Sequence, residues 1–335
     1  MSTIKDVARL AGVSSSTVSR TLTGRVFVDE KTREKVMEAV RALDYHPNAV
    51  AKGLREGKSR ELAFLVPDIN SLYYPMIMKS MERAASERGY TLSLHNCDEQ
   101  IRREKEILGS LRGRNIGGVL CMSVKDEVTH LLEFQKEEQC PVILINRYLD
   151  EALSSVTVDH EAGSYAMTRY LLEKGHRNFV IMLGNLDHER FRERYYGAKR
   201  ALTEFGIGNG ESYFITNIGT IEEAYSLTKN IFSEKAHPDA IFATMDILAI
   251  GVYSALASLG LGIPEDVSVV SFDNIFMSRY LNPPLTTYTT EVEAIAEKAI
   301  DLIAGWGETS RRKELPLEKI RITGAVEERE SVKAL

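Results

Sequence analysis

The chain has 335 residues, of which 44% are hydrophobic and 27% charged, a composition typical of folded globular proteins of more than one domain. It carries a net charge of −6, no apolar run long enough to span a bilayer and no signal-peptide pattern, so a cytoplasmic protein without membrane association is expected. The three cysteines, Cys97, Cys121 and Cys140, are odd in number and widely spaced, which favours free thiols over a disulfide framework. No metal and no cofactor is expected.

Charge is distributed unevenly along the chain. Residues 1–60 hold twelve Lys or Arg against seven Asp or Glu, a balance of +5, which leaves about −11 for the remainder. A basic module attracts phosphates electrostatically, so the N-terminal segment is the part of the chain expected to meet nucleic acid.

Three short helices are predicted at the N-terminus, over residues 4–11, 15–23 and 32–43. The tripeptide Gly12-Val13-Ser14 separates the first two, and Ser14 or Ser15 suits the N-cap of the second helix. Apolar residues recur at helical spacing in the third helix, enough to close a small core. This order of helix, tight turn and helix predicts a helix-turn-helix head over residues 1–46.

A further helical segment, residues 48–55, begins at a capping asparagine and contains Gly53. At about eight residues it is shorter than the ~12 to 15 at which an isolated helix becomes marginally stable in water. We expect it to fold only against a partner. The Gly57-Lys58-Ser59-Arg60 stretch after it is typical of a linker, which makes 47–60 a hinge and linker segment.

From residue 61 onward, short β-rich runs alternate with amphipathic stretches. The expected strands are residues 62–66, 91–94, 119–122, 142–145, 179–183, 213–218, 241–244 and 267–272. This rhythm predicts βαβ units and parallel sheets covered by helices. The fold class is therefore an all-α head followed by an α/β body of two Rossmann-like halves.

The second helix of a helix-turn-helix enters the major groove, where residues near its N-terminus reach the base edges. Ser15 and Ser16 occupy that position, and Arg20, one turn beyond Ser16, suits a bidentate contact to guanine. Thr17 and Ser19 suit phosphate contacts. The alternative is that Arg20 is an ordinary solvated surface charge.

The residues Thr3-Ile-Lys-Asp-Val-Ala-Arg-Leu-Ala-Gly-Val-Ser14, Ser16-Thr-Val-Ser-Arg20 and Tyr45-His-Pro-Asn-Ala-Val-Ala51 resemble the LacI/GalR family of bacterial repressors. Further similar motifs are Gly175-His-Arg177, Ile263-Pro-Glu-Asp-Val-Ser268, Phe272-Asp273, Pro283-Pro-Leu-Thr-Thr287 and Glu328-Arg-Glu-Ser331, so the resemblance covers nearly the whole chain. It implies DNA contacts from the head and from a hinge helix: Thr3, Ser14, Ser15, Ser16, Thr17, Ser19, Arg20, Asn48, Ala51, Leu54 and Arg55.

Within that hinge helix, Leu54 matches the leucine that the family wedges into the minor groove. An apolar wedge unstacks a base step and bends the duplex, which allows a dimer to contact more surface. The alternative is that Leu54 packs its own helix onto the body.

For the body, residues 61–335, the resemblance implies a type I periplasmic-binding-protein-like fold that binds an effector in a cleft and mediates dimerisation. Crossovers are expected near residues 160, 290 and 320. They divide the body into an N-subdomain of about 61–160 and 291–320 and a C-subdomain of about 161–290 and 321–335. Ligands in such sheets sit beyond the carboxyl ends of the strands.

Six residues at such positions are candidate effector contacts. Tyr73 and Tyr74 follow the first expected strand, and the alternative is that they pack the next helix. Arg194 matches the family's effector-binding arginine, and Asp273 follows the strand 267–272. Arg147 is either a contact or a surface ion-pair partner. Asp246 either caps the helix that it opens or contacts ligand.

The chain departs from the family's usual residues at three positions near these candidates, where it has Asn146, His160 and Met245. The effector is expected to be a sugar or sugar phosphate rather than a nucleobase. The other partners are double-stranded operator DNA and a second copy of the chain, because little sequence after Ser331 remains for a tetramerisation helix.

Two other functions are weighed against a metabolite-controlled repressor. An enzyme is not expected, since no P-loop, Gly-x-Ser-x-Gly or His-Glu-x-x-His motif is present. A solute-binding protein of a transport system would share the body fold but would require export and no DNA-binding head.

Overall fold

The computed structural model describes residues 2–23, 27–45, 59–147, 153–207, 213–233, 237–309 and 317–335. The chain forms two compact units, Met1–Ser59 and Arg60–Leu335. Within the described ranges, no helix is both long and apolar enough to cross a membrane. The expected hinge helix at residues 48–55 lies outside the described residues.

The N-terminal unit contains helices α1 (Ile4–Ala11), α2 (Ser15–Thr23) and α3 (Glu30–Ala42). Thr3 and Asp6 form a capping box that satisfies free N–H groups at the start of α1. Gly12 ends this helix with a φ of 66°, a left-handed conformation that glycine adopts without steric cost. The chain can therefore turn sharply and start α2 three residues later.

A small apolar core holds the three helices together. It consists of Val7, Ala8, Val18, Val36 and Ala39, all buried. Because Val18 is the buried residue of α2, the opposite side of that helix faces solvent. The helices α1 and α2 were predicted with the observed bounds; α3 begins two residues earlier than expected, because Asp29 accepts a hydrogen bond from the Thr32 N–H and caps it.

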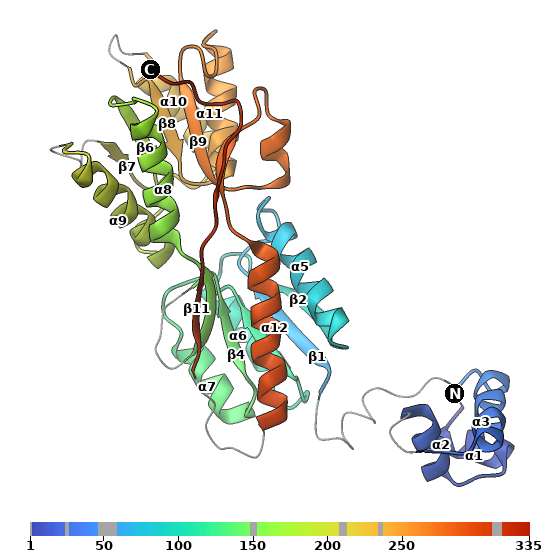
Figure 1. Ribbon diagram of the computed structural model, residues 1–335. Coiled ribbons are helices and arrows are strands. Elements are labelled where there is room, and N and C mark those ends of the chain that lie inside the picture. The colour runs from blue at the N-terminus through green and yellow to red at the C-terminus, as the bar shows by residue number, and fades with distance from the viewer. Residues whose placement is uncertain are drawn as a thin grey trace. The chain divides into compact units, whose positions relative to one another are not determined.

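The body contains two six-stranded sheets, and Figure 1 shows them as separate lobes. The first has the order β11-β5-β4-β3-β1-β2 and is parallel throughout. Its strands are β1 (Glu61–Val66), β2 (Thr91–Asn96), β3 (Gly118–Cys121), β4 (Val142–Ile145), β5 (Ser154–Val158) and β11 (Lys319–Ile322). Its helices are α5 (Tyr74–Glu87), α6 (Ile101–Leu111), α7 (Thr129–Glu138) and α12 (Val292–Thr309).

The second sheet has the order β12-β10-β9-β8-β6-β7, and only β12 is antiparallel to its neighbour. Its strands are β6 (Phe179–Met182), β7 (Phe214–Ile215), β8 (Ala240–Ala243), β9 (Ser268–Asp273), β10 (Thr286–Thr289) and β12 (Val326–Glu327). Its helices are α8 (His160–Glu173), α9 (Glu189–Glu204), α10 (Ile221–Ile231), α11 (Asp246–Ser258) and the 3-10 helix η2 (Phe276–Tyr280).

The chain passes between the sheets three times: after β5, after β10 and after β11. Each sheet places its first strand, β1 or β6, between the second and third, so the strand order reverses there. In sheets of this kind, ligands bind beyond the carboxyl ends of the strands at that reversal. The topology therefore directs attention to the loops after β1, β3, β4, β6, β9 and β10.

Strands β5, β10, β11 and β12 were not predicted from the sequence. They contain many threonines, serines and charged residues, for example Ser154-Ser-Val-Thr-Val158 and Lys319-Ile-Arg-Ile322, so they lack the apolar runs on which the predictions relied. The strand expected at 213–218 is confined to Phe214–Ile215.

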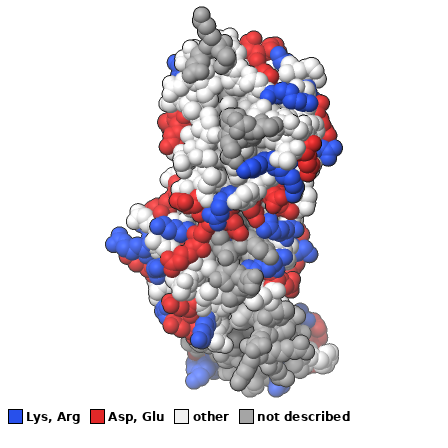
Figure 2. All heavy atoms as spheres, turned by 90° about the vertical axis from the view of Figure 1, so that its left-hand side faces the viewer, with Lys and Arg blue, Asp and Glu red and all other residues white. Residues whose placement is uncertain are grey.

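Exposed ion pairs cover helices α8 and α9. Arg169 pairs with Glu173, and Arg200 pairs with Glu161 and Glu204. On the side of the molecule drawn in Figure 2, basic and acidic side chains are likewise interspersed. Mixed charge of this kind is typical of a solvated surface.

Candidate nucleic-acid interface and effector site

Ser14 begins helix α2 by a side-chain cap. The Thr17 N–H donates to Ser14 Oγ at 3.1 Å, and that oxygen also lies 2.7 Å from Ser16 Oγ and 2.9 Å from Thr17 Oγ1. The serine therefore satisfies a backbone donor that the helix start leaves free. The capping residue of the second helix is thus Ser14, one of the two alternatives that the sequence left open.

The exposed side of α2 carries Ser16 and Arg20, which are four residues apart and share one face. Ser15, Thr17 and Ser19 are half-buried along the same helix, and Thr3 is engaged in capping α1. A small hydroxyl and a guanidinium on one exposed helix face suit contacts to base edges in a major groove. The hinge candidates Asn48, Ala51, Leu54 and Arg55 lie outside the described residues.

Polar side chains from both halves of the body meet at the carboxyl ends of the strands. Tyr73 follows β1, and its phenolic oxygen accepts a hydrogen bond from Asn146 Nδ2, which follows β4. Burial raises the pKa of Tyr73 well above its ordinary range, with the Asp273 carboxylate adding to the effect. Tyr73 therefore keeps its proton and lies within electrostatic reach of the second sheet.

Arg194 is the central residue of this cluster. Its Nη2 donates to Asp273 Oδ1 at 3.2 Å, its Nε donates to His160 Nδ1 at 3.3 Å, and its Nη1 donates to the Thr244 carbonyl. Its guanidinium carbon lies 3.8 Å from the centroid of the Phe272 ring. Only 3% of Arg194 is exposed, so hydrogen bonds and a cation–π contact replace its hydration.

The protonation states in this cluster are perturbed by burial. Burial raises the pKa of Asp273 to about 7, although the charge of Arg194 opposes the shift. Burial and the neighbouring arginines hold the pKa of His160 well below its ordinary value, so its imidazole is neutral. Because Nδ1 of His160 accepts from Arg194, its proton sits on Nε2, which has no hydrogen-bond partner among the described residues.

Asp273 also has a φ of 115°, a conformation that residues other than glycine rarely adopt. The Thr290 hydroxyl holds it there by donating to the Asp273 carbonyl at 3.2 Å. Strained backbone of this kind is found at binding sites, where surrounding contacts must maintain it.

The two halves of the body also touch through Asp126, in the loop after β3. Its Oδ2 accepts from the Glu189 N–H and from Arg192 Nη2, both at 2.9 Å, at the start of α9. A carboxylate at a helix N-terminus is stabilised by the helix dipole as well as by these hydrogen bonds. Asp126 therefore links the first half to the helix that carries Arg194.

Two further sequence candidates, Tyr74 and Asp246, are buried. Tyr74 packs in the main hydrophobic core and meets the Tyr73 ring edge-on, and the charges of Arg147 and Arg190 act on its hydroxyl. Asp246 is fully buried, and its oxygens accept from Ile275 N at 2.8 Å, from Thr287 Oγ1 at 2.7 Å and from Ser278 Oγ. It does not cap α11, whose N-cap is Met245; instead it anchors η2 and β10.

Several residues of the cluster escaped the list of sequence candidates. Arg190 lies one helical turn before Arg194 on α9, and this spacing of four residues was a usable signal. Asn146 and His160 were noted only as departures from the family's usual residues. Asp126 carries no local sequence signal, because only the tertiary fold brings it to the site.

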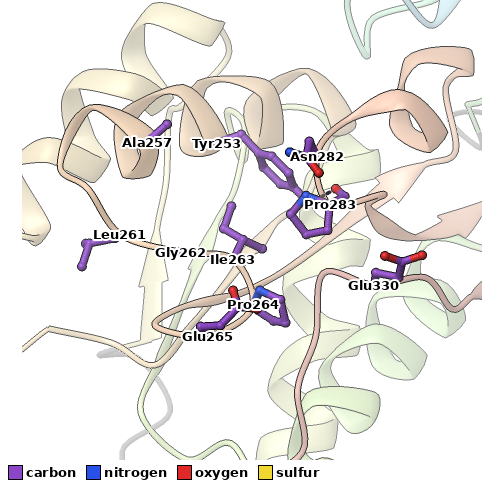
Figure 3. Close-up of a pocket in the computed structure, with 10 residues that line it drawn as sticks. All are labelled: Tyr253, Ala257, Leu261, Gly262, Ile263, Pro264, Glu265, Asn282, Pro283 and Glu330. Atoms are coloured by element: carbon purple, nitrogen blue, oxygen red, sulfur yellow. Dashed lines mark hydrogen bonds between the residues drawn. The ribbon is translucent and has the colours of Figure 1, made fainter.

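A separate hollow of about 580 Å³ lies at the opposite, amino end of β9 and β10 (Figure 3). At the edge of the hollow, the Tyr253 hydroxyl donates a hydrogen bond to the Pro283 carbonyl. The hollow is lined by Tyr253, Ala257, Leu261, Gly262, Ile263, Pro264, Glu265, Asn282, Pro283 and Glu330. None of the charged residues of the cluster lines it, so its position and its lining separate it from the candidate effector site.

Comparison with known proteins agrees with both parts of the chain. Residues 3–48 match the model for bacterial regulatory proteins of the lacI family, and residues 168–332 match a periplasmic binding protein-like domain. The HTH-type transcriptional repressor PurR of Vibrio atlanticus (strain LGP32) is 33% identical over 306 residues, which is 90% of this chain and 91% of that protein.

Solved structures share the fold over nearly the full length. The transcriptional regulator CelR in complex with cellobiose superposes with a TM-score of 0.73 at 26% identity, covering 99% of this chain and 100% of that one. The lac repressor dimer bound to operator and an anti-inducer superposes with a TM-score of 0.85 at 22% identity, covering 99% of each chain. The head, the body and the level of identity lead to one conclusion: this chain belongs to the lacI family of bacterial regulatory proteins.

Proposed function

We propose that this protein is a transcriptional repressor that binds a near-palindromic operator as a homodimer and responds to a sugar or sugar derivative. The observation that carries the proposal is the exposed face of α2, with Ser16 and Arg20, in a chain that belongs to the lacI family. Helix-turn-helix dimers place two such helices in successive major grooves about one helical turn apart.

The proposed division of labour on DNA follows from chemistry. Ser15, Ser16 and Arg20 contact base edges, while Thr17 and Ser19 contact phosphates. Thr3 and Ser14 keep their capping roles and support the helices from which these contacts are made. Asn48, Ala51, Leu54 and Arg55 are proposed to form the hinge helix that orders on the operator.

The proposed effector contacts are Tyr73, Arg147, Arg194 and Asp273. An aromatic ring suits the C–H face of a sugar, and a paired arginine and aspartate suit its hydroxyl groups. The CelR structure at 26% identity contains cellobiose, which supports a carbohydrate as the class of ligand. Asp246 is left out of this set because the protein itself uses both of its carboxylate oxygens.

A homodimer is supported by apolar side chains that η2 exposes. Phe276, Met277 and Tyr280 are 59%, 44% and 63% exposed, on one short helix of the second half. Large apolar residues that cluster on a surface mark interaction sites more often than isolated ones do. The lac repressor structure with the same fold is a dimer on its operator.

Effector binding is proposed to act on the contacts between the two halves. Asp126 joins the loop after β3 to the start of α9, and Tyr73 of the first half lies within reach of Asp273 of the second. A ligand that binds one arrangement of the halves better shifts the population toward it. Coupling between two such sites is typically about 1–3 kcal/mol.

The test begins with selection of operator sequences from random duplexes by the full-length protein. Recovery of one near-palindromic sequence is expected, and absence of any enriched sequence would contradict the proposal. Operator affinity is then measured by fluorescence anisotropy with and without a panel of sugars and sugar derivatives. Arg194→Ala is expected to keep operator binding and lose the response, while Arg169→Ala, at an exposed ion pair on α8, should keep both.

A further inference from the structure

Arg147 is a buried cation without an ionic partner in the part of the chain that the structure describes. It follows β4, is 3% exposed, and donates to the carbonyl oxygens of Ser123 at 3.0 Å and Asn146 at 3.4 Å. Its Nε has no hydrogen-bond partner. Burial lowers the pKa of Arg147 to about 10, with the charge of Arg190 adding to the effect.

Arg190 approaches from the other half of the body, in the first turn of α9. It is half-buried and stacks on the Phe191 ring at 4.6 Å, and within the described ranges it makes no ion pair. Its charge depresses the pKa values of His160 and Arg194 as well as that of Arg147. Arg147, Arg190 and Arg194 therefore lie within electrostatic reach of one another, with Asp126 and Glu189 as the nearby carboxylates of Arg147.

Two of the neighbouring carboxylates, Asp126 and Asp273, have other partners. Asp126 accepts hydrogen bonds from Arg192 and from the start of α9, and Asp273 pairs with Arg194. Asp273 is also half protonated near neutral pH, since burial raises its pKa to about 7. The charges of Asp126 and Glu189 act favourably on Arg147, but among the described residues no carboxylate forms a salt bridge with Arg147 or Arg190.

Burying a guanidinium without a counter-ion costs free energy, because the lost hydration is not replaced by an opposite charge. We infer that the effector carries an anionic group, a carboxylate or a phosphate, that binds between Arg147 and Arg190. This inference rests on the proposed function and specifies its effector as an acidic or phosphorylated sugar derivative. Neutral hydroxyl groups would accept hydrogen bonds there but would leave the charge uncompensated.

The two arginines lie on different halves of the body, so an anionic group that binds both affects the arrangement of the halves. Arg147 belongs to the first half of the body and Arg190 to the second, so one anion that contacts both joins the halves. A guanidinium can bind carboxylate or phosphate through two parallel hydrogen bonds, which fixes orientation as well as distance. Binding of the charged group would therefore favour the arrangement in which the halves are in contact.

Inorganic phosphate is the first probe, applied to the full-length protein at constant ionic strength set with sodium chloride. Saturable stabilisation in thermal unfolding is expected for the unaltered protein. Arg147→Met and Arg190→Met should each weaken phosphate binding at least about tenfold, whereas Arg102→Met, on the exposed face of α6, should not change it. Absence of saturable binding, or equal binding by Arg147→Met, would overturn the inference.

A second measurement separates a binding role from a structural one. Arg147→Met should raise the melting temperature without ligand, since it removes a buried uncompensated charge and keeps an apolar stem. A lower melting temperature together with unchanged phosphate affinity would assign Arg147 to packing and its carbonyl contacts alone.

Matched sugars identify the source of the charge: glucose, glucose 6-phosphate and glucuronate. Binding of the phosphate or the acid, but not of glucose, with loss in Arg147→Met, supports the inference and names the group. If glucose binds equally well to the unaltered protein and to Arg147→Met, the anion inference fails while the sensor remains. Failure of the proposed function is seen separately, as the absence of any selected operator.

Discussion

The buried Arg194 guanidinium donates to the Asp273 carboxylate at 3.2 Å, yet burial still raises the pKa of Asp273 to about 7. The two residues come from helix α9 and from the end of β9, and both are nine-tenths buried or more. The attraction between them is thus smaller than the cost of removing the carboxylate from water. The protein keeps this pair at a cost in stability, which is typical of functional sites.

The first prediction concerns the pH dependence of stability through Asp273. Its pKa is higher in the folded protein than in the unfolded chain, so the folded state binds more protons between about pH 4 and pH 7. The contribution of Asp273 to stability therefore falls as pH rises through that window. Asp273→Asn removes this dependence, so the variant should become more stable relative to the unaltered protein as pH rises.

Urea unfolding of the two proteins at pH 5, 6, 7 and 8 measures this difference. The stability of Asp273→Asn minus that of the unaltered protein should increase across the series, reaching a plateau above pH 7. A difference that stays constant from pH 5 to pH 8 would mean that pairing with Arg194 outweighs desolvation, and that the carboxylate is ionised throughout.

The second prediction concerns the contact that positions α9. A Cβ added to Gly197 would lie 2.1 Å from the Glu161 carbonyl oxygen and 3.0 Å from the Tyr165 nitrogen, on helix α8. Gly197→Ala must therefore push the helices apart, at a cost of about 1–3 kcal/mol, and displace Arg190 and Arg194. The free energy of unfolding, measured with guanidinium chloride, and the affinity for the effector should both decrease.

Gly109→Ala is the control for this substitution, since Gly109 is also helical but has open space around its Cβ position. It should stabilise the protein by up to about 1 kcal/mol, because alanine has the better helix propensity. If both variants gain stability, the close packing of α8 on α9 is not required.

The sequence predicted the helices and strands whose local residue pattern matches the structure that they form in the folded protein. Helices α1 and α2 have strong caps and a clear turn at Gly12, and strands β3, β4 and β8 and most of β1 are continuous apolar runs. Strands β5, β10, β11 and β12 carry polar or charged residues that interrupt the apolar pattern. Pairing of Lys319–Ile322 with Ser154–Val158, for example, is set by the tertiary fold rather than by the local pattern.

The candidate site was predictable to a smaller extent. Resemblance to a family pointed to Arg194 and Asp273, and the structure brings these two together with Tyr73 nearby. The sequence left two roles open for Asp246, a helix cap and an effector contact. Its hydrogen-bond partners, such as Ser278 and Thr287, are about thirty to forty residues away along the chain. The environment of a polar residue depends on neighbours that sequence spacing does not reveal.

The third prediction concerns Asp246 as the anchor of η2. Removal of its carboxylate by Asp246→Ala leaves the Ile275 N–H and the hydroxyls of Ser278 and Thr287 without their acceptor. The expected loss of stability is about 3 kcal/mol, since unsatisfied buried donors are costly. Asp187→Ala, which removes an exposed carboxylate, should cost less than about 0.5 kcal/mol.

Because η2 carries the exposed Phe276 and Tyr280, the same Asp246→Ala variant tests the proposed dimer surface. Sedimentation equilibrium below the melting temperature should show weaker dimerisation than for Asp187→Ala. A destabilised protein that dimerises with unchanged affinity would place the dimer interface away from η2.

The fourth prediction concerns base recognition by Arg20. A guanidinium bidentate to guanine contributes about 1–3 kcal/mol of discrimination at a single base pair. Arg20→Ala should therefore weaken binding to the selected operator by that amount and relax preference at one position in each half-site. Arg33→Ala removes the same charge from the exposed side of α3 and serves as the control.

The two variants are expected to lose operator affinity in different ways. The affinity of each variant is measured at several salt concentrations for a set of operators, each substituted at one position. Loss of a phosphate contact weakens binding to all sequences alike and lowers the salt dependence, whereas loss of a base contact changes the ranking of the sequences. A changed ranking for Arg20→Ala together with an unchanged ranking for Arg33→Ala would assign Arg20 to the bases. Equal losses on every operator would reassign it to the backbone and move base recognition to Ser15 and Ser16.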